Sequence, residues 1–96
     1  MVKVVAKNYV QKDKVEDFIS LAEKLVKATV QNDAGCIHYE LFQDSSDPQV
    51  LTIIEEWESM DLLKQHMAAA HFKEIVPQFA TLSEKPGETN LYQKLV

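Results

Sequence analysis

The chain contains no arginine, and this absence narrows the range of its partners. All ten of its positive charges are lysines, set against fifteen acidic residues, which gives a net charge of −5. Nucleic-acid-binding proteins present a basic face, usually one that carries arginine, so we expect no nucleic acid partner. Lysine also offers only a point charge where arginine offers a forked donor, which argues against bidentate recognition of a phosphate group.

Cysteine, glycine and long apolar runs are scarce as well. Cys36 is the only cysteine, so an intrachain disulfide and a cysteine metal cluster are both excluded. With two glycines the chain has no Gly-rich phosphate-binding loop. No apolar run approaches the ~20 residues of a membrane span, and lysines interrupt the first residues in a way that is unlike a signal peptide. We therefore expect a cytoplasmic protein with no membrane partner.

The first half of the chain shows two clear periodicities. Residues 2–10 alternate between apolar and polar side chains, which predicts a strand. A helix is predicted from Asp13, with Glu16 as its capping partner, because apolar residues then recur at steps of three and four as far as Val30. The segment 32–35, which ends in glycine, should stop this helix.

The next segment carries the signals of a hairpin followed by helix. Residues 36–43 and 49–58 are predicted strands on either side of a polar turn at 44–48. Ser59 is placed to cap the helix that follows. Pro77 interrupts the helical pattern and should produce a kink or a break into two short helices.

The chain ends with a turn signal and one further strand. Pro86-Gly87 marks the turn, and residues 89–96 form the strand. The element order β-α-β-β-α-β predicts one α+β domain over residues 1–96. Its expected fold is ferredoxin-like: an antiparallel sheet of four strands with the helices on one face.

Two of the predicted strands are apolar on both faces. In the strand at 49–58, one side carries Val50 and Ile54 and the other carries Leu51, Ile53 and Trp57. In the strand at 36–43, one side carries Cys36 and Phe42 and the other carries Ile37, Tyr39 and Leu41. Because the helices cover only one face of the sheet, the other face is expected to meet a second sheet. We therefore predict a homodimer, in which the open sheet faces of two subunits pack together.

Residues 57–72 combine the features of a small-molecule site. The only tryptophan, Trp57, and two of the three histidines, His66 and His71, fall within fifteen residues, and Phe72 follows at once. A histidine exchanges protons near neutral pH, and aromatic side chains beside it would form a pocket for a flat apolar molecule. Asn8, on the apolar face of the first strand, is a polar group that needs a partner.

Several short motifs together resemble the antibiotic biosynthesis monooxygenase family, and specifically its small quinol monooxygenases. They are Gly35-Cys36-Ile37-His38-Tyr39-Glu40-Leu41, Glu55-Glu56-Trp57-Glu58-Ser59, His66 and His71-Phe72. The resemblance covers nearly the whole chain. It implies a dimeric α+β barrel with one pocket per subunit between sheet and helices. It also implies oxygen chemistry without metal, haem or flavin, because the electron-rich substrate itself reacts with oxygen.

Two other branches of this family serve as contrasts. The haem-degrading branch has an asparagine that Asn8 matches, but it places tryptophan at the position of His66 and an axial histidine at that of Val76. Valine cannot ligate iron, so haem is disfavoured. A second branch isomerises phosphorylated diketones, and His66 with His71-Phe72 is compatible with that chemistry too.

The resemblance and the residue types together suggest roles in a monooxygenase pocket. His66 is the first candidate for the general base and His71 the second. Asn8 is a candidate donor to the oxygen anion of the substrate. Since Asn8 ends the first strand and Trp57 the third, and these strands should be neighbours, both are expected on the wall of the cavity that His66 faces. The ring-binding candidates are Trp57, Phe72, Tyr39 and Phe42.

Glu55, on the Trp57 face of its strand, is a further pocket candidate, as a partner for a histidine or a lysine. No metal site is predicted, because His66 and His71 are five residues apart, about 140° around a regular helix. Three functions remain open: a cofactor-independent monooxygenase acting on a quinol or another enolisable aromatic with O2, an isomerase of a small diketone, and a dimer that binds a small aromatic without catalysis.

Overall fold

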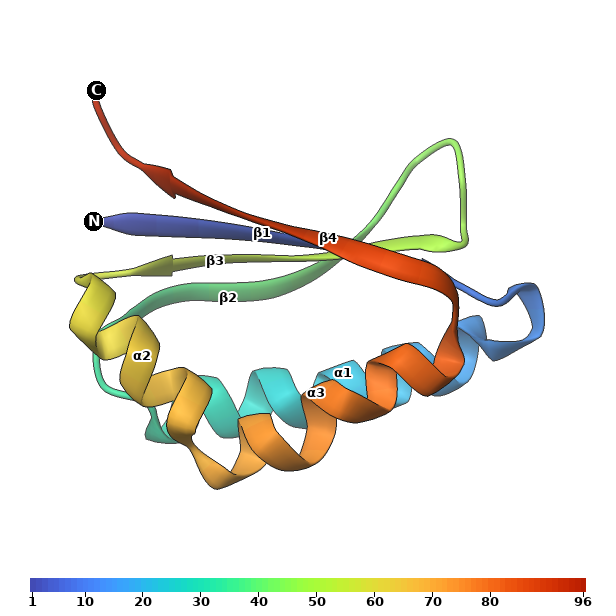
Figure 1. Cartoon of the computed structure of the whole chain (residues 1–96), viewed down its shortest axis with the longest axis horizontal. Helices are drawn as coiled ribbons and strands as arrows, with labels where there is room; N and C mark the ends of the chain where they lie inside the picture. The colour runs from blue at the N-terminus through green and yellow to red at the C-terminus, as the bar shows by residue number, and fades with distance from the viewer.

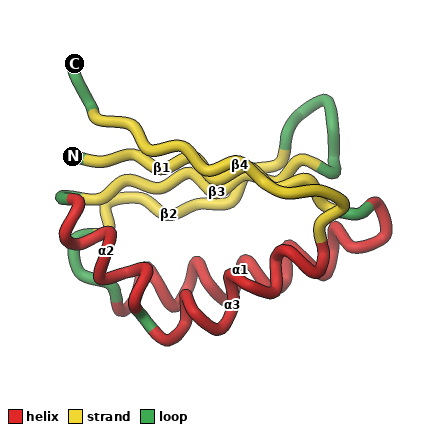
Figure 2. The backbone as a smooth tube through the Cα atoms, viewed as in Figure 1, coloured by secondary structure: helices red, strands yellow, loops and turns green.

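A computed structural model describes all residues, 1–96, and has the ferredoxin-like fold (Figure 1). The sheet is antiparallel, with strand order β2-β3-β1-β4, so the first and third strands are neighbours at its centre, as predicted. Figure 2 shows the helices together on one face of this sheet. The elements are β1 (Val2–Val10), the 3-10 turn η1 (Lys12–Lys14), α1 (Val15–Asn32), β2 (Cys36–Gln43), β3 (Val50–Trp57), α2 (Met60–Ala68), α3 (Ala70–Leu82) and β4 (Ser83–Gln93).

Helix α1 buries most of the predicted apolar stripe against the sheet, but Val30, its last predicted member, is 60% exposed near the end of the helix. Phe18, Ala22 and Leu25 are fully buried, and the ring of Phe18 stacks on Phe79 of α3 at 4.4 Å between ring centroids. The predicted start at Asp13 is wrong: this residue lies within η1, and α1 begins two residues later without a side-chain cap. A 3-10 turn commonly precedes an α-helix, and here it occupies the position at which the cap was predicted.

The hairpin of β2 and β3 has the predicted bounds to within one residue, but one side chain faces the other way. A bulge between Cys36 and His38 pairs Cys36 with Trp57, so Cys36 packs against the core and not beside Phe42. A bulge adds one residue to a strand and thereby reverses the alternation of side chains beyond it. Phe42, Val50 and Ile54 do lie on the face away from the helices, as the alternation predicted.

The helical segment after β3 breaks at a different residue from the one predicted. Ser59 caps α2 as expected, accepting a hydrogen bond from the backbone N–H of Leu62 at 3.2 Å. The break falls at Ala69, whose ψ of 149° is extended, and Pro77 lies inside α3. The three alanines around the break favour helix, so nothing local interrupts it. Packing decides the break, because it allows α3 to run beside α1 while α2 stays near the end of β3.

Strand β4 begins six residues earlier than predicted and ends three residues earlier. It runs through Pro86-Gly87, which form a bulge opposite Asn8 in β1 instead of a turn. Proline is tolerated here because β4 is an edge strand. A Cβ atom on Gly87 would lie 2.5 Å from the backbone oxygen of Lys7, so only glycine fits this close approach.

The helices cover only one of the two faces of the sheet. The buried core lies between the sheet and the helices, and the other face is open in this single chain. That open face carries Phe42, 46% exposed, and Tyr92, 54% exposed. None of the helices has the length and apolar character needed to cross a membrane.

Candidate active site

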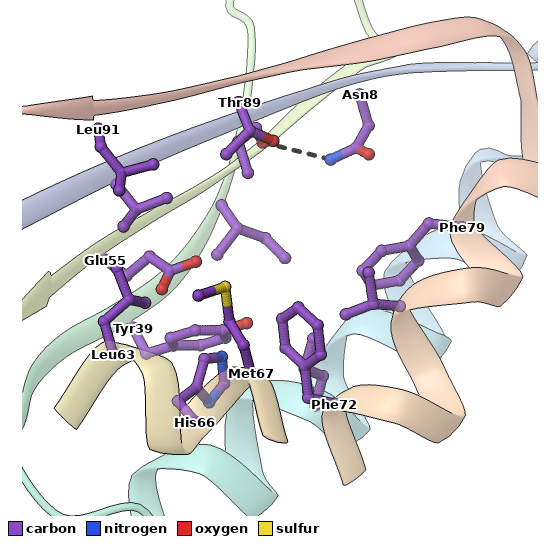
Figure 3. Close-up of a pocket in the computed structure, with 15 residues that line it drawn as sticks. Asn8, Tyr39, Glu55, Leu63, His66, Met67, Phe72, Phe79, Thr89 and Leu91 are labelled. Carbon is purple, nitrogen blue, oxygen red and sulfur yellow. Dashed lines mark hydrogen bonds between the residues drawn. The ribbon is translucent and has the colours of Figure 1, made fainter. Parts of the chain in front are cut away.

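A pocket of about 140 Å³ lies between the sheet and the helices and is mainly apolar. Figure 3 shows the pocket between the strands of the sheet on one side and α2 and α3 on the other, and Leu25 of α1 also lines it. Its polar lining residues are Asn8, Tyr39, Glu55, His66 and Thr89. A mainly apolar cavity with a few polar groups is the usual form of a site for a small molecule.

His66 projects from α2 into a cage of aromatic rings. Its ring centroid lies 4.6 Å from that of Trp57 and 5.1 Å from those of Tyr39 and Phe72. The residue is only 1% exposed. This burial lowers the pKa of His66, although the nearby carboxylate of Asp33 opposes the effect. The imidazole is therefore neutral near pH 7 and able to accept a proton.

The two nitrogens of this imidazole have different surroundings. Nδ1 lies 2.5 Å from Oδ2 of Asp33, whereas Nε2 is buried and has no hydrogen-bond partner. Buried polar atoms are nearly always paired, so an unpaired one needs an explanation. His66 lines the pocket and Asp33 does not, and Nε2 is the ring nitrogen without a protein partner.

Asp33 contacts both candidate histidines, and in the sequence it is recognisable only as part of the segment that ends a helix. Its Oδ2 atom also lies 2.8 Å from Nε2 of His71. We call Asp33, His66 and His71 the Asp33 triad. The sequence separations of 33 and 38 residues conceal this cluster, and the helix break at Ala69 lets His71 turn toward the carboxylate. His71 does not line the pocket.

The Asp33 triad also contains three side chains of the kind that bind metal ions, and their ligand atoms lie within 4.8 Å of one another. Ligands around Zn²⁺ stand about 2 Å from the ion, and therefore roughly 3 Å or more from each other. Oδ2 instead lies at hydrogen-bond distance from both nitrogens, 2.5 and 2.8 Å. The geometry is that of a hydrogen-bonded triad. The predicted absence of a metal stays a prediction, and its argument from regular helical spacing fails at the Ala69 break.

Glu55 is a buried carboxyl group in the same pocket. Burial raises its pKa from 4.5 to about 7, and a hydrogen bond from Trp57 partly opposes this rise. That bond joins the indole Nε1 to Oε1 of Glu55 at 2.7 Å. The predicted partner was a histidine or a lysine, and the observed one is the indole. Burial likewise raises the pKa of Tyr39, so its hydroxyl stays protonated.

Asn8 lines the pocket, but its amide donors are already used. Nδ2 donates to the backbone oxygens of Ala6 and Leu51, both at 3.2 Å, and Figure 3 draws one hydrogen bond of Asn8 as a dashed line. In this arrangement Asn8 ties β1 to β3 beside the Gly87 bulge and has no free N–H for a substrate.

The structure brings some of the predicted site residues together and separates others. His66, Asn8, Glu55, Tyr39 and Phe72 line one pocket. Three predicted residues lie outside it: Trp57 is fully buried behind His66, His71 sits behind Asp33, and Phe42 is on the opposite sheet face.

The expected convergence of Asn8 and Trp57 is wrong. In the antiparallel pairing of β1 and β3, Asn8 lies opposite Leu51, and Trp57 lies opposite Val2. The end of one strand therefore meets the start of the other, about 20 Å apart at ~3.3 Å per residue. Val76 lines the pocket, and its side chain offers no atom to bind iron.

Comparison with known proteins agrees with this architecture. The family model described as antibiotic biosynthesis monooxygenase matches residues 1–78. A conserved protein from Methanosarcina mazei, of known structure, is 39% identical, with 98% of this chain and 92% of that chain covered and a TM-score of 0.94. An antibiotic biosynthesis monooxygenase of known structure is 29% identical, with 100% of both chains covered and a TM-score of 0.92.

A curated relative is longer than this chain. The uncharacterized protein sll1783 from Synechocystis is 31% identical over 91 residues, which cover 94% of this chain and 61% of that protein. This chain therefore spans less than two thirds of that relative's length. The family model covers most of the chain, and the fold and the quoted motifs agree with it. We conclude that this chain belongs to the antibiotic biosynthesis monooxygenase family.

Proposed function

We propose that this protein is a cofactor-independent monooxygenase that oxidises a small quinol or another enolisable aromatic with O2. One observation carries the proposal. The Nε2 atom of His66 is buried and unpaired, and this residue lines a mainly apolar pocket. A neutral imidazole with a free nitrogen is suited to take a proton from a hydroxyl or an activated C–H group.

The proposed reaction begins with proton transfer from the substrate to His66. The resulting anion is electron-rich and passes one electron to O2, and the two radicals then join in a carbon–oxygen bond. The peroxide so formed takes up a proton, and the same carbon loses its remaining hydrogen as a proton. The O–O bond breaks, a C=O group forms and water leaves. A CH2 group loses four electrons when it becomes C=O. In a quinol, the aromatic C–H group loses two electrons and the oxidation of the quinol to the quinone supplies the other two. In both cases one O2 accepts four electrons, and water is the other product.

Glu55 is the second proton-transfer group in this proposal. A pKa of about 7 allows it to be present as acid and as carboxylate near neutral pH. It is 6% exposed and lines the pocket, so its proton is kept from bulk water. We assign it the delivery of a proton to the reduced oxygen. Two ionisable groups whose surroundings shift their pKa values in opposite directions are a common basis for acid–base chemistry.

The size of the pocket favours a single aromatic ring. Its volume is about 140 Å³, and an apolar cavity of roughly 150 Å³ is known to hold benzene. A two-ring substrate would require side chains at the pocket edge to move. Met67, 41% exposed, and Leu91, 49% exposed, are apolar lining residues with room to do so.

The isomerase alternative receives less support from the pocket. No lysine lines it, and the chain has no arginine, so a phosphate group would find no cationic partner there. The carboxylate of Glu55 would also repel a phosphate group. Binding without catalysis remains the competing function, and activity measurements separate it from the proposal.

Oxygen consumption with a panel of one-ring and two-ring quinols tests the proposal. We expect turnover that His66→Ala lowers by about 10²-fold or more, the usual scale for loss of a general base. His38→Ala is the matched control, because His38 lies on the sheet face opposite the pocket. Since that face is also the proposed dimer interface, the control variant must keep the wild-type mass in light scattering. A wild-type protein that binds these quinols but consumes no oxygen with any of them would favour the binding function.

We also propose a homodimer formed through the open sheet faces. The exposed rings of Phe42 and Tyr92 and the side chain of Ile54 lie on that face. Burying them against a second copy would remove apolar surface from water. This assembly leaves the pocket, on the opposite face, available to a substrate.

A further inference from the structure

The proposed oxidation gives no role to the carboxylate of Asp33, which lies in the Asp33 triad. Asp33 is the residue at which α1 ends, and its backbone N–H donates to the carbonyl of Thr29 at 2.9 Å. This bond fixes the position of Asp33 beside α2 and α3. Its side chain is 9% exposed and its Oδ2 atom meets one nitrogen of each histidine.

These contacts determine where the protons sit. An ionised carboxylate only accepts hydrogen bonds, so each nitrogen that faces it must be an N–H donor. Nδ1 of His66 and Nε2 of His71 are therefore protonated. A neutral imidazole carries one such proton, and in His66 this leaves Nε2 with a free electron pair. The unpaired atom is thus the basic one.

We propose that Asp33 is a positioning residue that holds His66 in its Nδ1–H form, with Nε2 as the base of the pocket, and that His71 holds Asp33 in place. This inference rests on the proposed function for its kinetic part, but the assignment of the protons does not. The negative charge of Asp33 also stabilises the imidazolium that forms when Nε2 takes a proton, as the carboxylate does in a Ser-His-Asp triad.

The burial of the three residues fits these roles. The side chains of His66, Asp33 and His71 are 0%, 9% and 19% exposed. An Asp–His contact shielded from water is stronger than one at the surface. The other ionisable groups around His66 are Tyr39 on β2 and Glu55 on β3, and neither is hydrogen-bonded to its ring.

Nitrogen-15 NMR of the full chain at pH 7.5 tests the proton assignment without any substrate. We expect His66 to show a protonated Nδ1 and an unprotonated Nε2, with its signals identified by their loss in His66→Asn. In Asp33→Asn we expect a mixture of the two neutral forms, because an amide can either donate or accept. A proton found on Nε2 in the wild type would overturn the inference.

Kinetics of Asp33→Asn tests the positioning role. We expect kcat to fall by about 10²-fold or more with KM changed little. We also expect the acid limb of the kcat/KM profile to move to lower pH, because Asp33 raises the pKa of His66. Asp17→Asn makes the same chemical change at an exposed site of α1 and serves as the control. An unchanged kcat with an unmoved acid limb would refute the role.

The two proposals can fail separately. A wild-type protein with the Nδ1–H form of His66 and no monooxygenase activity would refute the proposed function and leave the proton assignment standing. Full activity in a wild-type protein with the proton on Nε2 would refute the proton assignment and leave the proposed function standing.

Discussion

The ionisation of Glu55 should make this protein less stable as the pH rises. Its pKa is raised from 4.5 to about 7 in the folded state, mainly by burial. The folded protein then binds a proton that the unfolded chain has released, so stability is lost as the pH rises from 4.5 through 7. Each unit of pKa difference corresponds to about 1.4 kcal/mol, which places the full cost of ionisation at about 3 kcal/mol.

Glu55→Gln removes the ionisation and keeps the shape. The amide oxygen of glutamine can still accept the hydrogen bond that Trp57 Nε1 donates over 2.7 Å. We expect the free energy of unfolding of the variant, relative to that of the wild type, to rise by about 2 to 3 kcal/mol as the pH goes from 5 to 8. That is a large share of the ~5–15 kcal/mol that stabilises a typical domain.

Urea unfolding followed by the fluorescence of Trp57, the only tryptophan, measures this difference at each pH. Glu23→Gln is a suitable control, because Glu23 is an exposed carboxylate on α1. A stability difference between Glu55→Gln and wild type that stays constant from pH 5 to pH 8 would refute the reasoning. It would show that Glu55 is better solvated than its burial indicates.

Three further outcomes are expected. Trp57→Phe removes the donor that lowers the pKa of Glu55, so the carboxyl signal in infrared titration should persist to higher pH than in wild type; an unchanged titration would contradict this. Gly87→Ala should lower the free energy of unfolding by about 1–3 kcal/mol, measured in urea, because its Cβ would lie 2.5 Å from the oxygen of Lys7; wild-type stability would argue against the close approach. Light scattering at micromolar concentration should give twice the chain mass of 11.0 kDa and a smaller value for Phe42→Lys; a wild-type monomer would disprove the dimer.

The local sequence was enough to determine the order and type of the elements. Alternation in residues 2–10 and the stripe of α1 reflect burial on one face of a strand or a helix, which is a local periodic property. Ser59 was recognisable as a cap for the same reason, since a cap bonds to the backbone three residues on. These signals predicted the ferredoxin-like fold, and residue motifs predicted the family.

The candidate site was only partly visible in the sequence. His66, Glu55, Tyr39 and Phe72 were selected by residue type and face, and the structure places all four in one pocket. Trp57 was selected on the same grounds but lies behind His66. Residue type indicates that an aromatic side chain will be buried, but it does not distinguish the wall of a cavity from the packing behind it.

Only the tertiary structure decided what surrounds His66. Asp33 is a residue at a helix end until folding brings it against two histidines from other helices. The break at Ala69 contradicts local helix propensity, and the bulge at Pro86-Gly87 replaced a predicted turn. Each depends on contacts between segments far apart in the chain, and such contacts can outweigh local preferences of about 1 kcal/mol per residue.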